Sequence, residues 1–122
     1  MGNPRIVAGC PTSDYHEYCI NGYAGAIRSL SYPYYDDVLL VDNSKDMRYT
    51  DRLRKFGFKI IKDEFKARAR DRIVSSRNIL RKFALEHNYD YFLSLEQDVI
   101  PPLDIVERLL AAKKDIISGV YF

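Results

Sequence analysis

The chain has 122 residues, of which 47% are hydrophobic and 30% are charged, a balance typical of one globular domain with its own core. Its 19 basic residues exceed its 17 acidic ones by two, and a net charge of +2 gives no reason to expect a nucleic-acid partner. No apolar run approaches the length of a membrane span and no secretory signal is recognisable near residue 1, so we expect a cytoplasmic protein.

Hydrophobic runs and helical periodicity alternate along the chain. Residues 5–10 predict a strand closed by Pro11, and 17–30 predict a helix with Asp14 as a possible cap. A second strand is predicted at 37–42. A short helix follows near 50–57, with Thr50 as its cap and Gly57 as its stop. The remaining predictions are a strand at 59–62, a helix at 75–88, a strand at 89–95, a helix at 102–114 and a strand at 115–122.

This alternation of strands and helices predicts an α/β fold. No linker, repeat or low-complexity stretch divides the sequence, so we expect a single domain over residues 1–122. Its sheet should be open and mainly parallel, with helices on both faces. Ligands of such sheets bind beyond the carboxyl ends of the strands, where the winding direction reverses.

Polar residues follow three of the predicted strands at the point where each strand ends. The three groups are PTS at 11–13, DNS at 42–44 and EQD at 96–98. Because the carboxyl ends of parallel strands meet at one edge of the sheet, these groups should lie close together. This coincidence is the strongest functional signal that the residues themselves give.

The segment after the first strand excludes two common phosphate-binding devices. It reads GCPTSDYHE, which contains neither the G-x-G-x-x-G of a dinucleotide fold nor a P-loop. A phosphorylated ligand would therefore need cations. Glu96 and Asp98 are suited to hold a hard divalent metal whose remaining ligands are water and phosphate oxygens. Four arginines lie just upstream, at positions 68, 70, 72 and 77.

Each of these features also has a simpler explanation. The two carboxylates after the strand are equally suited to capping the next helix or to staying solvated, and Asp42 to making a local Asx-turn. The arginine-rich run is compatible with a solvated loop. Cys10, His16 and Cys19 suggest a zinc site only weakly, because a structural zinc site needs four ligands and no fourth is evident. Buried free thiols are the better interpretation.

Taken together, the motifs resemble a known family. The segments that carry the resemblance are IVAGCPT at 6–12, LLVDNSKD at 39–46, SSRNILRKFALEHNYDYFLSLEQDVIPP at 75–102 and LDIVERLLAAKKDIISGVYF at 103–122. They resemble the nucleotide-binding half of a GT-A fold glycosyltransferase, of the large inverting family that includes cellulose, chitin and dolichol-phosphate-sugar synthases. The resemblance implies a Rossmann-like sheet with strand order about 3-2-1-4 plus a fifth strand.

The resemblance also implies a role for each motif residue. Pro11 and Thr12 would line the nucleotide pocket, with Asn43 beside them, and Asp42 would accept a hydrogen bond from the base, most often uracil. The metal site and the diphosphate site would be formed by three further residues. Arg77 would support the diphosphate or the acidic loop, Glu96 would face the ribose or the metal, and Asp98 would coordinate Mn²⁺ or Mg²⁺.

Two departures from the family pattern matter. The first carboxylate of the family's D-x-D is Glu96, one methylene longer, so its share in metal binding is less certain than that of Asp98. The family's acceptor-binding half and its general base lie downstream of the segment that resembles this chain. No catalytic base is therefore named here, and an exposed strand edge is expected to make the chain a homo-oligomer, most simply a dimer.

The sequence thus favours a metal-dependent glycosyltransferase, or its donor-binding half, that uses a nucleotide sugar, with UDP as the favoured nucleotide and an unknown acceptor. The alternatives are a non-catalytic module that binds a nucleotide or nucleotide sugar and, with less support, a nucleic-acid-binding protein that uses the basic run at 66–82.

Overall fold

The computed structural model describes residues 4–32 and 37–119. Its four strands are β1 (Ile6–Thr12), β2 (Val38–Asp42), β3 (Lys59–Lys62) and β4 (Tyr91–Ser94). They form one parallel sheet in the order β3-β2-β1-β4. The predicted α/β class and strand order are confirmed.

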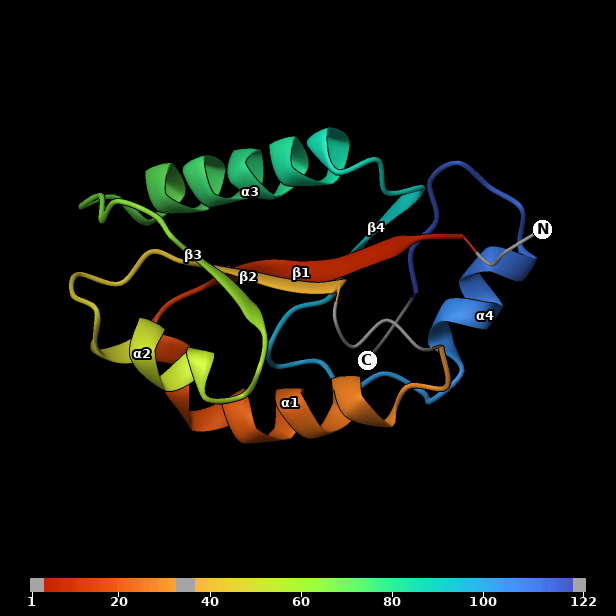
Figure 1. Cartoon of the computed structure of the whole chain (residues 1–122), viewed down its shortest axis with the longest axis horizontal. Helices are drawn as coiled ribbons and strands as arrows, with labels where there is room; N and C mark the ends of the chain where they lie inside the picture. Colours follow the sequence, from red (N-terminus) through yellow and green to blue (C-terminus); the bar gives the residue numbers. More distant parts are fainter. Residues whose placement is uncertain (1–3, 33–36, 120–122) are drawn as a thin grey trace.

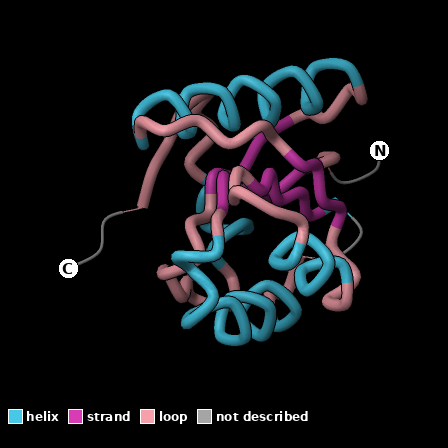
Figure 2. Tube along the Cα trace, turned by 90° about the vertical axis from the view of Figure 1, so that its left-hand side faces the viewer, coloured by secondary structure: helices cyan, strands magenta, loops and turns pink. Residues whose placement is uncertain are grey.

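Helices cover both faces of this sheet (Figure 1). One face carries α3 (Ala69–Glu86), and the opposite face carries α1 (Ile20–Ser29), α2 (Arg48–Arg54) and α4 (Ile105–Ala111). A 3-10 helix, η1 (Asp14–Cys19), leads into α1. Figure 2 shows the same layers from the side, with the strands between α3 and the other helices. No helix within the described ranges combines the length and hydrophobicity that crossing a membrane requires.

The two central strands are buried along their whole length. Every residue of β1 and β2 is buried, because each strand has a neighbour on both sides and helices on both faces. Alternate side chains enter different cores. Val7, Leu39 and Val41 pack with Leu80 of α3, whereas Ala8 and Leu40 belong to the larger core on the opposite face. This explains why these strands are continuous apolar runs rather than alternating ones.

The first strand continues through Pro11 to Thr12, two residues beyond the prediction. Proline lacks an N–H, so it normally breaks a central strand. Here β4 has already ended opposite Gly9. The carbonyl of Pro11 faces the side of β1 on which β4 pairs only as far as Gly9. It accepts a hydrogen bond from Gln97 there. The missing N–H faces that same side, so the ladder with β2 loses nothing.

Two predicted helix starts were wrong. Met47 is the N-cap of α2, and Thr50 lies inside the helix, fully buried, where its hydroxyl donates to Asp42. Asp14 is the first residue of η1 rather than a cap, and Ser13 precedes it. The hydroxyl of Thr50, which the sequence pattern assigned to a cap, donates instead to the buried carboxylate of Asp42. Helix α2 ends at Arg54, three residues before the predicted stop at Gly57, whose φ of 84° is one that glycine adopts readily.

The other ends also differ from the predictions. The long helix begins at Ala69 instead of residue 75, and the last helix covers only Ile105–Ala111. The predicted fifth strand is absent over residues 115–119, while residues 120–122 lie outside the described ranges. The isoleucines there favour a strand, but strand propensity is expressed only where a neighbouring edge pairs with the segment. Within the described residues, β4 is therefore an edge of the sheet.

Gly9 provides a test of how closely β1 and β2 approach. A Cβ at this position would lie 1.9 Å from the carbonyl oxygen of Leu39, which is backbone and cannot move aside. We expect Gly9→Ala to lower the free energy of unfolding by about 3 kcal/mol or more. Gly22 of α1 is the matched control, because a Cβ there meets nothing within 4 Å. Gly22→Ala should raise stability by about 0.5–1 kcal/mol.

Urea titration of the two variants beside the wild type measures both effects. A Gly9→Ala variant as stable as the wild type would contradict this account of the strand contact.

Candidate functional site

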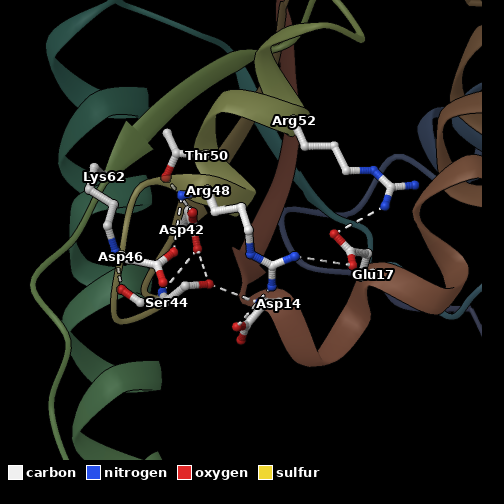
Figure 3. A network of polar contacts seen from close by, with 9 residues as sticks. All are labelled: Asp14, Glu17, Asp42, Ser44, Asp46, Arg48, Thr50, Arg52 and Lys62. Carbon is white, nitrogen blue, oxygen red and sulfur yellow. Dashed lines mark hydrogen bonds and ion pairs between the residues drawn. The ribbon is translucent and has the colours of Figure 1, made fainter.

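The centre of the carboxyl end of the sheet is the buried side chain of Asp42 (Figure 3). Asp42 is the last residue of β2 and is fully buried. Its Oδ1 accepts hydrogen bonds from the backbone N–H of Ser44 at 2.9 Å and from the hydroxyl of Ser44 at 2.7 Å. Its Oδ2 accepts one from the hydroxyl of Thr50 at 2.5 Å. The carboxylate therefore closes an Asx-turn and ties β2 to α2.

The role of Asp42 in binding a base stays a prediction. Both carboxylate oxygens already accept hydrogen bonds from this chain, and the residue has no exposed surface. A direct contact with a base would have to use a remaining lone pair from within a closed environment. The most immediate effect of Asp42 is to fix the loop at 43–44. Asn43 and Ser44 are 5% and 3% exposed, whereas Asp42 has no exposed surface.

A second buried network surrounds Asn43. The amide of Asn43 donates to the hydroxyl of Ser76 at 3.1 Å, and that hydroxyl donates to Asp63 at 2.9 Å. Ser75 also donates to Asp63, at 3.1 Å, and Lys66 forms an ion pair with it at 3.9 Å. Asp63 is not among the predicted site residues. It directly follows β3, so the rule that selected the polar residues after the other strands would also have found it.

The end of β1 contributes a buried hydroxyl, that of Thr12. Thr12 is 2% exposed, and its backbone carbonyl accepts the N–H of Asn43 at 3.0 Å. Within the described part of the chain, neither its hydroxyl nor that of Tyr49 makes a hydrogen bond of good geometry. Thr12 nevertheless lies close enough to act on the tyrosine. Burial is the largest cause that raises the pKa of Tyr49 to about 12, and Thr12 opposes this rise.

The acidic loop after β4 divides its three side chains between different neighbours. Gln97 points inward, 2% exposed, and donates to the carbonyl of Pro11 at 2.9 Å. Glu96 forms an ion pair with Arg77 of α3 at 2.7 Å. Asp98 is exposed. The charge of Cys19 is the largest cause that raises the pKa of Tyr18, and burial is the largest that raises the pKa of Cys19; the charge of Asp98 adds to both. The structure thus brings Arg77 to Glu96, as predicted for the acidic loop, and places Asp98 beside η1.

Two arginines of α2 hold η1 against this end of the sheet (Figure 3). Arg52 pairs with Glu17 at 3.0 Å, and Arg48 lies 3.9 Å from both Glu17 and Asp14. The backbone N–H of Asp14 donates to the hydroxyl of Ser44 at 2.8 Å. Exposed ion pairs each contribute little to stability, about 0–1 kcal/mol. Their combined effect is to position η1 beside the loop that Asp42 organises.

The donor set suits a hard divalent ion only in part. In the described ranges, no three residues of the histidine, cysteine, aspartate or glutamate type gather as a metal cage. Mg²⁺ is commonly held by one or two carboxylates together with substrate phosphates and water, so such a cage is not required. Asp98 is exposed and makes no ion pair within the described part of the chain, whereas Glu96 would first have to leave Arg77. The residues fit a metal that arrives with a phosphorylated ligand.

The weakly suggested zinc site has no counterpart in the described residues. Cys10 is buried, and its thiol contacts the hydroxyl of Tyr23 at 3.9 Å and the amide of Gln97. Cys19 is partly exposed and donates to the carbonyl of His16 at 3.3 Å. Both cysteines are free. The expectation of a buried thiol is confirmed for Cys10 and was wrong for Cys19.

No protein-family model, curated protein or solved structure matches the chain.

The structural role of Asp42 can be tested by its removal. Asp42→Ala would leave buried hydroxyls of Ser44 and Thr50 without an acceptor, so we expect a loss of about 3 kcal/mol in the free energy of unfolding. Asp46→Ala is the matched control, because Asp46 is exposed and accepts one similar bond, from the N–H of Arg48 at 3.0 Å. The control should lose less than about 1 kcal/mol, and urea unfolding measures both values. Equal losses in the two variants would refute the central role of Asp42.

The buried thiol predicts sensitivity to alkali. Burial raises the pKa of Cys10 well above its ordinary value of 9.0, and the nearby charge of Glu96 adds to the rise. The unfolded chain therefore releases this proton first as the pH rises. The stabilising contribution is complete below pH 9 and is progressively lost above it, with a slope of up to about 1.4 kcal/mol per pH unit for one group.

Denaturation curves between pH 8 and pH 11 measure this slope. Cys10→Ala should flatten the loss of stability above pH 9, while Cys19→Ala, which removes a less buried thiol, should keep most of it. Parallel curves for the wild type and Cys10→Ala would contradict the assignment.

Proposed function

We propose that this domain binds the donor of a glycosyl transfer, a nucleoside diphosphate sugar with UDP as the favoured nucleotide, at the carboxyl ends of β1, β2 and β4. The observation that carries the proposal is the convergence of three strand ends. The hydroxyl of Thr12, the ordered loop at Asn43, and the Arg77–Glu96 pair with the exposed Asp98 beside it all lie at this edge. Parallel α/β sheets bind nucleotides at this edge.

Arg77 would act on the diphosphate. Its guanidinium is half-exposed and held in a defined position by Glu96 at 2.7 Å and by the hydroxyl of Ser94 at 3.3 Å. A diphosphate is a stronger competitor for a guanidinium than a single half-exposed carboxylate, because it presents several charged oxygens. Binding would then turn Arg77 toward the phosphates and free Glu96. The pre-formed pair keeps both side chains ordered until the ligand arrives.

The nucleoside would lie nearer to β1 and β2. Thr12 supplies a buried hydroxyl that makes no hydrogen bond of good geometry in the described part of the chain, with the hydroxyl of Tyr49 as its neighbour. A buried group of this kind is costly unless a ligand or water completes its hydrogen bonds. Pro11 shapes the same turn. Asp42 would contribute by holding the loop at 43–44 in place, in addition to any direct contact with the base.

Mn²⁺ or Mg²⁺ held by Asp98, with Glu96 as a second ligand, would neutralise charge on the leaving diphosphate. The chain's own arginine shares that task, and the fixed loops keep the donor in one orientation. The acceptor and the general base are outside this proposal. A domain that binds the same donor without transferring its sugar would have the same site, and a transfer assay with the bound donor distinguishes the two.

Calorimetry with UDP and GDP, each with Mn²⁺ and with excess EDTA, tests the proposal. We expect binding that requires the metal, an Asp98→Asn variant weakened at least about tenfold, and a smaller effect of Glu96→Gln. Asp51→Asn is the control, because Asp51 is an equally exposed acid that pairs with Arg54 on α2, away from this loop. Equally tight binding in EDTA would refute the metal, and failure of every nucleoside diphosphate to bind would refute the site.

A further inference from the structure

The two edges of the sheet differ in how they are protected against pairing. β3 has the sequence KIIK, and a lysine at each end of an edge strand discourages another strand from joining it. β4 has the sequence YFLS and carries no charge. Its Tyr91 is 44% exposed and its Phe92 is 39% exposed. This open, apolar edge is the kind that pairs with a further strand.

A groove of about 350 Å³ lies alongside this edge, between β4 and the second half of α3. We call it the β4 groove. The residues of α3 that line it include Leu80, Arg81, Ala84 and Leu85, and those of β4 include Phe92 and Ser94. Leu85 is 66% exposed. The groove therefore offers apolar side chains directly beside a strand edge.

The backbone of β4 is arranged to receive a strand there. The N–H groups of Tyr91 and Leu95 donate to β1 or to the residue before it, at the carbonyls of Arg5 and Gly9. N–H groups alternate in direction along a strand, so those of Phe92 and Ser94 point away from β1, to the open side of the sheet. Among the described residues no strand occupies that side.

The chain also carries an apolar segment that matches the groove. Residues 115–119 follow α4, form no strand, and expose Ile116 by 94% and Ile117 by 41%. None of them lines the groove of its own chain. The segment has the β-branched residues that favour a strand, but in this structure it is not paired with a strand edge.

Charge selects the direction of pairing. In the described part of the chain, Arg81 at the groove and Asp115 beside the exposed isoleucines both lack an ion pair. An antiparallel arrangement with Ile117 opposite Phe92 places Asp115 opposite Ser94, on the face of α3 and its arginines. A parallel arrangement with the same central pair would instead place Asp115 opposite Asp90, a like charge.

We propose that the β4 groove binds residues 115–119 of a second copy of this chain as an antiparallel strand. Each copy offers one groove and one segment, so two copies close a two-fold dimer by exchanging them. Ile117 would then be covered by Leu85 and Phe92, and Ile116 would lie on the opposite face of the strand, beside Leu93. The free edge of β4 would be paired. This inference does not depend on the proposed function, because pairing along β4 requires no ligand at the carboxyl end of the sheet, although Arg77 lines the groove as well.

Sedimentation velocity at micromolar concentration tests the proposal with three single variants. Leu85→Lys alters the groove, Ile116→Lys alters the segment, and Ile100→Lys places the same change at another isoleucine, 75% exposed and outside the groove lining. We expect a wild-type dimer, a dissociation constant raised at least about tenfold in the first two variants, and no change in the third. Leu85 and Ile116 are both largely exposed, so a lysine at either position is compatible with folding.

A mixture of the Leu85→Lys and Ile116→Lys proteins gives the sharpest result. One partner retains an intact segment and the other an intact groove, so the mixture should form a heterodimer with one good contact although each protein alone is a monomer. A monomeric wild type would overturn the proposal, and so would a dimer that survives Ile116→Lys, which would indicate direct pairing of two β4 edges. A mixture that stays monomeric would overturn it as well.

Discussion

The structure at the carboxyl end of the sheet depends on the buried carboxylate of Asp42. Three hydrogen bonds from Ser44 and Thr50 converge on it, and the residue has no exposed surface. A buried charge is tolerated only where such donors replace the water that it has lost. Its presence therefore fixes the turn after β2 and the start of α2, and Ser44 passes that order on to η1 through the N–H of Asp14.

The parts of the fold that the sequence could predict are those set by local pattern. Fully apolar runs identify β1 and β2 because buried parallel strands must be apolar on both faces. Thr50 could not be placed from its neighbours in sequence, since its hydroxyl is claimed by Asp42, eight residues earlier. Residues 115–119 have strand propensity without a strand, because pairing is decided by the edge available and not by the segment itself. Pro11 shows the reverse case. A proline normally breaks a central strand, but β1 continues through Pro11 because its neighbour β4 has already ended opposite Gly9.

The candidate site was predictable as a location and less so as a set of contacts. Polar residues after parallel strands must meet at one edge, so Thr12, Asn43 and Glu96 could be grouped without a structure. Nothing in the motif EQD shows that Gln97 turns inward to Pro11 while Glu96 pairs with Arg77. Those directions depend on which side chains α3 and β1 present, and that information is spread over distant parts of the chain.

Arg77 connects the carboxyl-end site with the side of the sheet. It pairs with Glu96 at the carboxyl end, bonds the hydroxyl of Ser94 in β4, and also lines the β4 groove. A strand added beside Ser94 would exclude water from one side of this guanidinium. The Arg77–Glu96 interaction would then act in a lower dielectric and strengthen. A diphosphate that draws Arg77 away would meet more resistance in the paired form. Pairing at the edge and ligand binding at the strand ends would therefore be linked through Arg77, which belongs to both surfaces.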